Sequence, residues 1–161
     1  MEELKRKIDA IIEMTFRRLE TVYKEHKEGF TANLPLKQHN VSRLVFPSYF
    51  GNDVDGQRKA KSTRISEQEL RFSFVESFNE YCNNPENNAN LFYSVETPTK
   101  ETYSGFTTDP KLDPNGRSAE FDMVIYDENL NRVCLIEFKA NNAAEVDHKK
   151  DFLKLKEDEK K

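Results

Sequence analysis

The sequence predicts an α+β protein in which a small β-sheet is flanked by helices. Apolar residues recur every three or four positions near the N-terminus and again after residue 66, which is the period of amphipathic helices. Two strand-like runs in the second half of the chain are separated by a short polar link, as in a β-hairpin. The length of 161 residues is that of one domain with one core.

Residues 2–28 are predicted to form a long amphipathic helix that Gly29 ends. The spacing is close to a heptad over about three repeats, so this helix either packs on the domain or pairs with a second copy in a homodimer. We expect residues 1–29 to be a separate N-terminal helix and residues 30–161 to be a single domain. The apolar stripe of the helix consists of Leu4, Ile8, Ile11, Thr15, Leu19 and Val22.

Residues 30–64 are expected to be irregular, because prolines and glycines interrupt them. Residues 56–64 carry a run of cations without an acid, although the whole chain has a formal net charge of -4. This run is either a solvated loop or a loop that contacts phosphates. Its cations are Arg58, Lys59, Lys61 and Arg64.

Residues 66–82 are predicted to form a second helix. Ser66 followed by Glu69 is a capping-box pattern at its start. Its apolar face consists of Leu70, Phe74, Phe78 and Tyr81. Residues 91–96 then read as a strand, and a polar connection is expected from there to Gly116.

Residues 120–127 and 132–139 are predicted to pair as a hairpin through the polar link at 128–131. If Tyr126 pairs with Val133, Asp122 lies opposite Glu137 and their side chains share one face. Two adjacent carboxylates repel each other unless a cation or a shared proton lies between them. Because side chains alternate along a strand, Lys139 is expected on the same face as Glu137.

Residues 144–161 are predicted to form the last helix. Its apolar side is expected to hold Val146, Phe152 and Leu155.

The carboxylates of Asp122 and Glu137 and the main-chain carbonyl of Phe138 are hard oxygen ligands of the kind that Mg²⁺ or Mn²⁺ prefers. A metal ion there could lower the pKa of a bound water and neutralise charge on a phosphoryl oxygen. Lys139 would add a positioned donor beside it. The alternative for these residues is an exposed ion pair at the end of a strand.

The helix, strand, hairpin and helix, with D-x14-E-F-K in the hairpin, resemble the PD-(D/E)XK nuclease superfamily over residues 66–155. The resemblance implies a restriction-endonuclease-like αβββαβ core with a small mixed sheet. It also implies that Asp122 and Glu137 bind the metal and that Lys139 assists the attacking water. Phe121 replaces the proline of the motif. No apolar run follows the last helix, so we expect the final core strand to be missing and the chain to be truncated.

The superfamily usually adds a glutamate from the first core helix. A helical wheel places Glu67 on the core-facing side, and its spacing to Leu70 and Arg71 resembles the E-x-x-V-R stretch of type I restriction enzyme nuclease domains. Glu67 is therefore our choice, and Glu69 is the alternative. The helix offers Glu67, Glu69, Glu76 and Glu80.

The resemblance predicts a magnesium-dependent or manganese-dependent nuclease that hydrolyses DNA, with catalytic residues Glu67, Asp122, Glu137 and Lys139. One alternative is a non-catalytic module of the same fold that binds nucleic acid or protein, and another is an assembly protein acting through residues 2–28. No membrane-length apolar run and no signal peptide are visible, so a cytoplasmic location without membrane partners is expected. DNA or RNA as substrate, cleavage specificity, and restriction or repair as role remain open.

Overall fold

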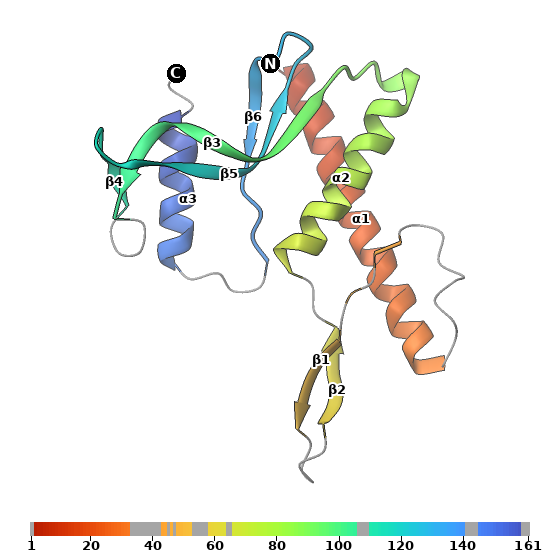
Figure 1. Ribbon diagram of the computed structural model, residues 1–161. Coiled ribbons are helices and arrows are strands. Elements are labelled where there is room, and N and C mark those ends of the chain that lie inside the picture. The colour runs from red at the N-terminus through yellow and green to blue at the C-terminus, as the bar shows by residue number, and fades with distance from the viewer. Residues whose placement is uncertain are drawn as a thin grey trace. The chain divides into compact units, whose positions relative to one another are not determined.

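The computed structural model describes residues 2–32, 43–44, 46, 48–52, 58–63, 66–105, 110–140 and 145–158 (Figure 1). It combines helices with a small antiparallel sheet, which confirms the α+β class. The chain forms two compact units, Met1–Ala89 and Asn90–Lys161. The division into residues 1–29 and 30–161 stays a prediction, and the compact units meet at a different point in the sequence.

In the first unit, α1 (Glu2–Ala32) packs along α2 (Glu67–Asn83). The predicted stripe is buried from its second member onward, so α1 uses this face to pack within its own unit, and pairing with a second copy stays a prediction. Gly29 does not end the helix, since one glycine costs about 1 kcal/mol in a helix and is tolerated. The buried members are Ile8, Ile11, Thr15, Leu19 and Val22.

The capping box of α2 is confirmed. The Ser66 main-chain N–H donates to Glu69 Oε2 over 2.7 Å, and the Ser66 hydroxyl also contacts this carboxylate. Phe74 and Phe78 are buried, with ring centroids 6.3 Å apart. A short 3-10 helix, η2 (Pro85–Asn87), follows.

The expectation of an irregular segment over residues 30–64 is wrong where the structure describes it. The strands β1 (Ser48–Asn52) and β2 (Arg58–Thr63) pair antiparallel, with Phe50 opposite Ala60. A hairpin of this kind satisfies backbone hydrogen bonds by pairing with itself, so polar sequences can form it without an apolar run. Three of the four predicted cations thus belong to a strand rather than a loop, and Arg64 lies outside the described residues.

The second unit holds a four-stranded sheet in the order β4-β3-β5-β6, and each described pairing is antiparallel. Its strands are β3 (Phe92–Ser104), β4 (Lys111–Leu112), β5 (Arg117–Tyr126) and β6 (Arg132–Ile136). Figure 1 shows β3 and β5 as a long curled ribbon with α3 (Glu145–Asp158) beside it. Three consecutive residues of β5 are fully buried, so both faces of this central strand are covered: Met123, Val124 and Ile125.

Strand β3 continues well beyond residue 96, so the polar connection predicted from there is wrong for residues 97–104. Thr97, Thr99 and Tyr103 are buried, and the pairing with β5 shifts register between Pro98 and Thr102. The Thr99 hydroxyl accepts from the Ala119 N–H at 3.0 Å. Threonine hydroxyls make their own hydrogen bonds inside the sheet, which is why a polar sequence forms a buried strand here.

Helix α3 turns a different face inward from the one predicted. Phe152 is 69% exposed, whereas Asp151, Lys154 and Asp158 are buried. The side chain of Val146 lies outside the described residues. The prediction failed because charged side chains were assigned to solvent, although here they find ionic partners in β6 and in the segment that follows it.

Candidate functional site

The β5–β6 hairpin brings the two predicted carboxylates together. Met123 pairs with Ile136, and this is the register in which Asp122 and Glu137 form the next pair, just beyond the end of β6. The predicted register is therefore confirmed next to the site. At the turn it differs, because a register shift after Ile125 places Tyr126 opposite Arg132 instead of Val133.

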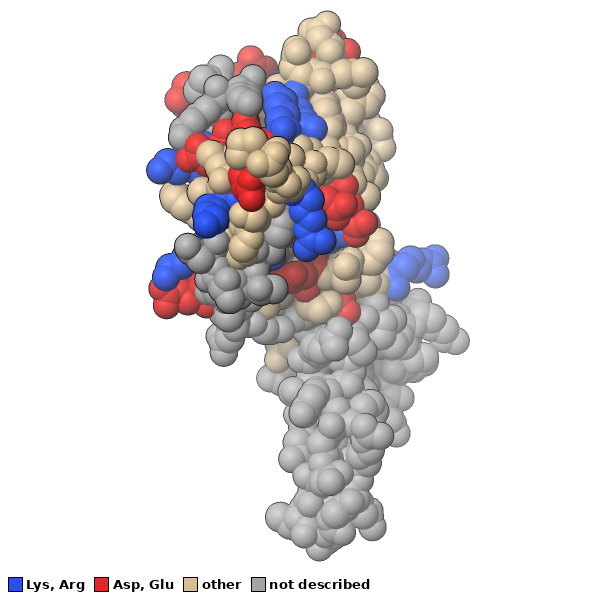
Figure 2. Space-filling model, turned by 60° about the vertical axis from the view of Figure 1, so that its left-hand side comes forward, with Lys and Arg blue, Asp and Glu red and all other residues tan. Residues whose placement is uncertain are grey.

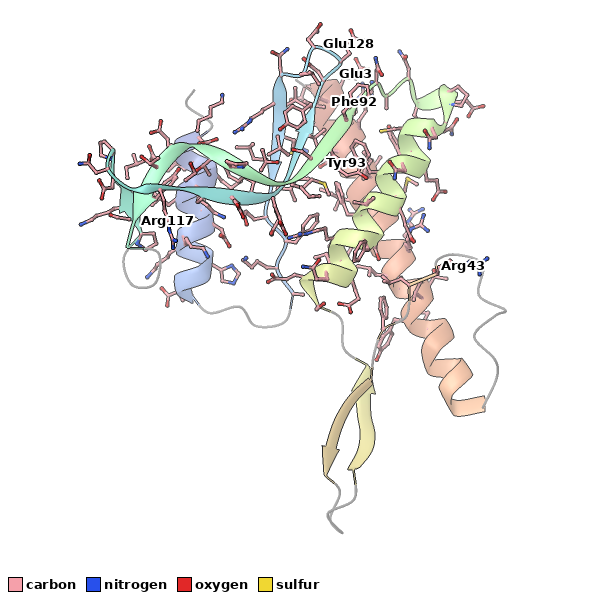
Figure 3. The ribbon with its side chains drawn as sticks, viewed as in Figure 1. Glu3, Arg43, Phe92, Tyr93, Arg117 and Glu128 are labelled. Atoms are coloured by element: carbon pink, nitrogen blue, oxygen red, sulfur yellow. The ribbon has the colours of Figure 1, made fainter. Side chains whose placement is uncertain are left out.

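Hydrogen bonds to Asp127 stabilise the tight turn that joins β5 and β6. The Asp127 carboxylate accepts the main-chain N–H groups of Asn129 and Asn131, each at 2.9 Å, and the Asn131 side-chain amide at 2.8 Å. These bonds, above all the one from the Asn131 side chain, lower the pKa of Asp127. Figure 3 shows Glu128 at the tip of this turn and Arg117 at the far end of the ribbon, so Asp122 lies between them in the body of β5.

Asp122 is tied to the segment that carries Glu137. One oxygen of its carboxylate accepts the Phe138 main-chain N–H at 2.8 Å. The Phe138 side chain is buried, which anchors this segment to the core. The charge of Asp122 is one of the influences that raise the pKa of Glu137, as expected for neighbouring carboxylates.

The side chain of Glu137 is buried and contacts Lys154 of α3. The Lys154 ammonium reaches Glu137 Oε1, the main-chain oxygen of Glu120 at 2.8 Å, and Asp151 Oδ1 at 3.0 Å. The side chains of Glu137, Asp151 and Lys154 are only 7%, 7% and 5% exposed. The expected alternative of an exposed ion pair at a strand end is therefore wrong for Glu137.

Burial alone would raise the pKa of both acids, but the net pKa shifts of Glu137 and Asp151 have opposite directions. Burial raises the pKa of Glu137 to about 7, even though the contact with Lys154 acts in the other direction. Burial also acts to raise the pKa of Asp151, but Lys139 and Lys154 together outweigh it and hold that pKa below its usual range. A proton entering this cluster is therefore expected on Glu137 before Asp151.

Lys139 reaches the same helix. Its ammonium lies 2.7 Å from Asp151 Oδ2, so Asp151 connects Lys139 to Lys154. Glu137 and Lys139 both contact side chains of α3, which agrees with their predicted place on one face. The partner of Lys139 in this contact is Asp151, which the sequence analysis did not consider.

Two residues of this cluster, Asp151 and Lys154, were missed because they are charged residues in a charged helix. The available signal was their spacing: with Asp158 they recur at the three- and four-residue intervals of one helical face. Asp158 fixes this face to the sheet. Its carboxylate accepts the N–H groups of Lys100 at 2.8 Å and Glu101 at 3.1 Å, and it pairs with Arg132 at 3.2 Å.

The cluster opens into a pocket of about 780 Å³. Glu137, Lys139 and Asp151 line it, and cationic or titratable side chains of α3, namely His148, Lys149 and Lys156, add to its wall. On the part of the surface that Figure 2 draws in colour, cationic and acidic side chains are interspersed. The pocket thus offers both signs of charge to a polar ligand.

Glu67, the predicted helix carboxylate, lies in the first unit at the start of α2 and is half-buried. The other glutamates of α2 have structural partners: Glu69 closes the capping box, and Glu76 and Glu80 contact Arg18. The choice of Glu67 over its alternative, Glu69, stays a prediction. The participation of Glu67 in the site of the second unit also stays a prediction.

Asp122, Glu137 and the Phe138 carbonyl fit Mg²⁺ or Mn²⁺ by the chemistry of their oxygen atoms, and Lys154 places a cation among such oxygens. Within the residues that the structure describes, no three acidic, histidine or cysteine side chains gather as a metal site. The predicted set therefore depends on two carboxylates and a main-chain carbonyl.

Among the described helices, none has the length and apolarity to cross a membrane.

The family assignment has no independent support from known proteins. No family model matches the chain, and no curated protein and no solved structure is significantly similar to it. The resemblance to the PD-(D/E)XK superfamily therefore depends on the residues and the geometry described above.

Proposed function

We propose that the protein is a metal-dependent nuclease of the PD-(D/E)XK type that hydrolyses phosphodiester bonds of DNA. The observation that carries the proposal is the β5–β6 register, in which Asp122 becomes the neighbour of Glu137, and Glu137 lines a pocket. The succession of the antiparallel strands β3, β5 and β6 with α3 packed against β3 supports a restriction-endonuclease-like core.

Each residue has a distinct role in this proposal. Asp122, Glu137 and the Phe138 carbonyl hold Mg²⁺ or Mn²⁺, which when bound supplies an activated water and neutralises phosphoryl charge. Lys139 directs an ammonium donor at the attacking water or the phosphate. Asp151 positions Lys139 through the 2.7 Å contact. Glu67 adds a further carboxylate from α2.

Cations are available for the phosphates of a nucleic acid. Lys149 and Lys156 line the pocket, and Lys149, which pairs with Glu145 at 2.8 Å, is well exposed. We include the cations of residues 58–64 as a second phosphate-contacting segment. Contacts to phosphates supply affinity for a nucleic acid without sequence preference.

A non-catalytic binding module is the second candidate, and one observation favours it. Lys154 contacts the carboxylate that the metal needs, so Glu137 already has a cationic partner within the chain. If that ion pair is permanent, the fold keeps the hairpin geometry but not the metal. The two candidates differ in whether the purified protein cleaves DNA when Mg²⁺ or Mn²⁺ is supplied.

A cleavage assay on plasmid DNA, linear DNA and RNA tests the proposal. Wild type should cleave DNA with Mg²⁺ or Mn²⁺ and not with EDTA, while Asp122→Asn and Glu137→Gln should be inactive. Lys139→Met should slow cleavage about a hundredfold or more, on the order of 3 kcal/mol of barrier. Glu120→Gln is the matched control, because it removes an exposed carboxylate beside Asp122 and should cleave like wild type.

Equal cleavage rates for wild type and Lys139→Met at saturating Mg²⁺ would exclude a catalytic role for this lysine. Metal-independent DNA binding without cleavage by any form of the protein would instead favour the binding module.

A further inference from the structure

The Lys154 ammonium occupies an oxygen cage that resembles the shell of a metal ion. Three oxygens from three segments of the second unit surround it: a carboxylate oxygen after β6, a carboxylate oxygen of α3 and a main-chain oxygen of β5. The Phe121 ring lies 5.8 Å from the ammonium and closes one side. Carboxylate and carbonyl oxygens are also the donors that bind hard divalent cations.

A buried ammonium in this place requires an explanation. Burying two opposite charges costs several kcal/mol per ion, which their attraction does not always offset, so a buried pair is weak evidence for stability alone. One of the carboxylates that surround Lys154 is Glu137, which the proposed function assigns to the metal. Lys154 and a divalent cation therefore compete for the same carboxylate.

We propose that Lys154 is a built-in counter-ion of the metal-free protein and that a divalent cation displaces it from Glu137 on binding. This inference rests on the proposed function, because it takes Glu137 to be a metal ligand. In the metal-free protein, Lys154 keeps Glu137 and its neighbours together despite the repulsion among their charges. Metal affinity is then the outcome of an exchange of cations at one carboxylate.

Asp151 makes this exchange feasible. If Lys154 leaves Glu137, it keeps contact with Asp151 at 3.0 Å and with the Glu120 carbonyl at 2.8 Å, so the ammonium is not left buried and unpaired. Asp151 also holds Lys139 at 2.7 Å. The same carboxylate thus retains the displaced cation and positions the lysine of the proposed reaction.

The exchange has a measurable consequence. A ligand that binds only the folded state stabilises it in proportion to the logarithm of its concentration over Kd. Removing the competitor should tighten Kd and enlarge the stabilisation by metal, even though the same change weakens the metal-free fold. A lysine with a purely structural role would weaken the fold without changing Kd.

The test measures Mn²⁺ and Mg²⁺ binding to the DNA-free protein by calorimetry, and the melting temperature in EDTA and in saturating metal. Lys154→Met should melt below wild type in EDTA, bind Mn²⁺ about tenfold more tightly or better, and gain more melting temperature from the metal than wild type does. Lys150→Met, a lysine of the same helix outside the pocket lining, is the matched control and should bind like wild type. Glu137→Gln should lose binding.

If Lys154→Met does not fold, Lys154→Gln keeps a hydrogen-bond donor without the charge, and the same gain in affinity is expected. Equal or weaker binding by the Lys154 variants, with binding by wild type that depends on Glu137, would overturn the counter-ion role and leave the proposed metal site intact. Absence of binding in wild type and in both variants would overturn the counter-ion role together with the metal-dependent function.

Discussion

Arg18 of α1 and Lys154 of α3 both connect their helix to carboxylates elsewhere in the same compact unit, but in different surroundings. Arg18 contacts Glu76 at 3.3 Å and also reaches Glu80, and these acids are 37% and 62% exposed. Lys154 contacts Glu137 and Asp151, which are each 7% exposed. The first set lies where water competes for each partner, and the second lies where water is largely excluded.

The comparison separates ion pairs with exposed acidic partners from ion pairs that are buried on both sides. Exposed pairs contribute about 0 to 1 kcal/mol, because solvent screens them and side-chain entropy opposes them. A buried pair is strongly interdependent, since loss of one partner leaves the other charge without compensation. We therefore expect the contacts of Arg18 to Glu76 and Glu80 to contribute little to stability, and the contacts of Lys154 to contribute strongly.

The largest predicted effect comes from breaking the buried pair. Lys154→Met should lower the free energy of unfolding of the metal-free protein by about 3 to 5 kcal/mol, because it leaves Glu137 buried without its cation. The double variant Glu137→Met/Lys154→Met should recover most of this loss, since an apolar pair of similar volume replaces an ionic one. Urea unfolding in EDTA of the two single variants and the double variant measures the coupling.

Additive losses in that cycle would show that Lys154 acts mainly through Asp151 and the Glu120 carbonyl. In that case the comparison with Arg18 would no longer depend on Glu137.

The arrangement of the hairpin was predictable from local signals. Alternation within β5 and β6 and a polar link of fixed length determine which residues face each other near the site, so the neighbourhood of Asp122 and Glu137 followed from the sequence. The capping box of Ser66 and Glu69 is equally local. In each case the interacting residues are close in sequence, or their pairing follows from the number of residues that separate each of them from the hairpin turn.

The surroundings of the site were not predictable in the same way. Asp151 and Lys154 read as solvated residues until the fold places β5 and the end of β6 against them, because the cost of burial depends on partners distant in sequence. The length of β3 was missed for a related reason. Thr99 is buried because Ala119 supplies its hydrogen bond, and that pairing is a property of the sheet.

A smaller effect concerns pH. Burial raises the pKa of Glu137 from 4.5 to about 7, so between these values the folded state holds a proton that the unfolded state has released. This group should therefore lower the stability of the metal-free protein as the pH rises from 4.5 to 7. The lowered pKa of Asp151 acts below its ordinary value of 3.8, outside this window.

Urea unfolding in EDTA across that window checks the sign. Wild type should lose stability relative to Glu137→Gln as the pH rises, whereas Glu120→Gln should follow wild type. Parallel curves for wild type and Glu137→Gln would mean that Lys154 keeps Glu137 ionised throughout. The attraction of Lys154 would then have a larger effect on the pKa of Glu137 than burial has.

The smallest effect is predicted for the exposed side of the comparison. Arg18→Met should lower the free energy of unfolding by about 1 to 2 kcal/mol. Glu76 and Glu80 regain water when the guanidinium is removed, and the methionine keeps part of the packing of the arginine stem. The buried Ser77 hydroxyl, however, loses the hydrogen bond that Arg18 Nε donates at 3.2 Å. Lys5→Met provides the lower reference: its pair with Asp9 spans one turn of α1 with both side chains more than half exposed, and it should contribute about 0.5 kcal/mol or less. Urea unfolding at low and high salt measures both, since screening should shrink the two effects.

The Arg18 side chain is itself only 12% exposed, and this makes the measurement informative. A loss of about 3 kcal/mol or more for Arg18→Met would show that burial of the cation alone makes an ion pair indispensable, and the distinction drawn between Arg18 and Lys154 would then have to come from Glu137 and its neighbours rather than from exposure.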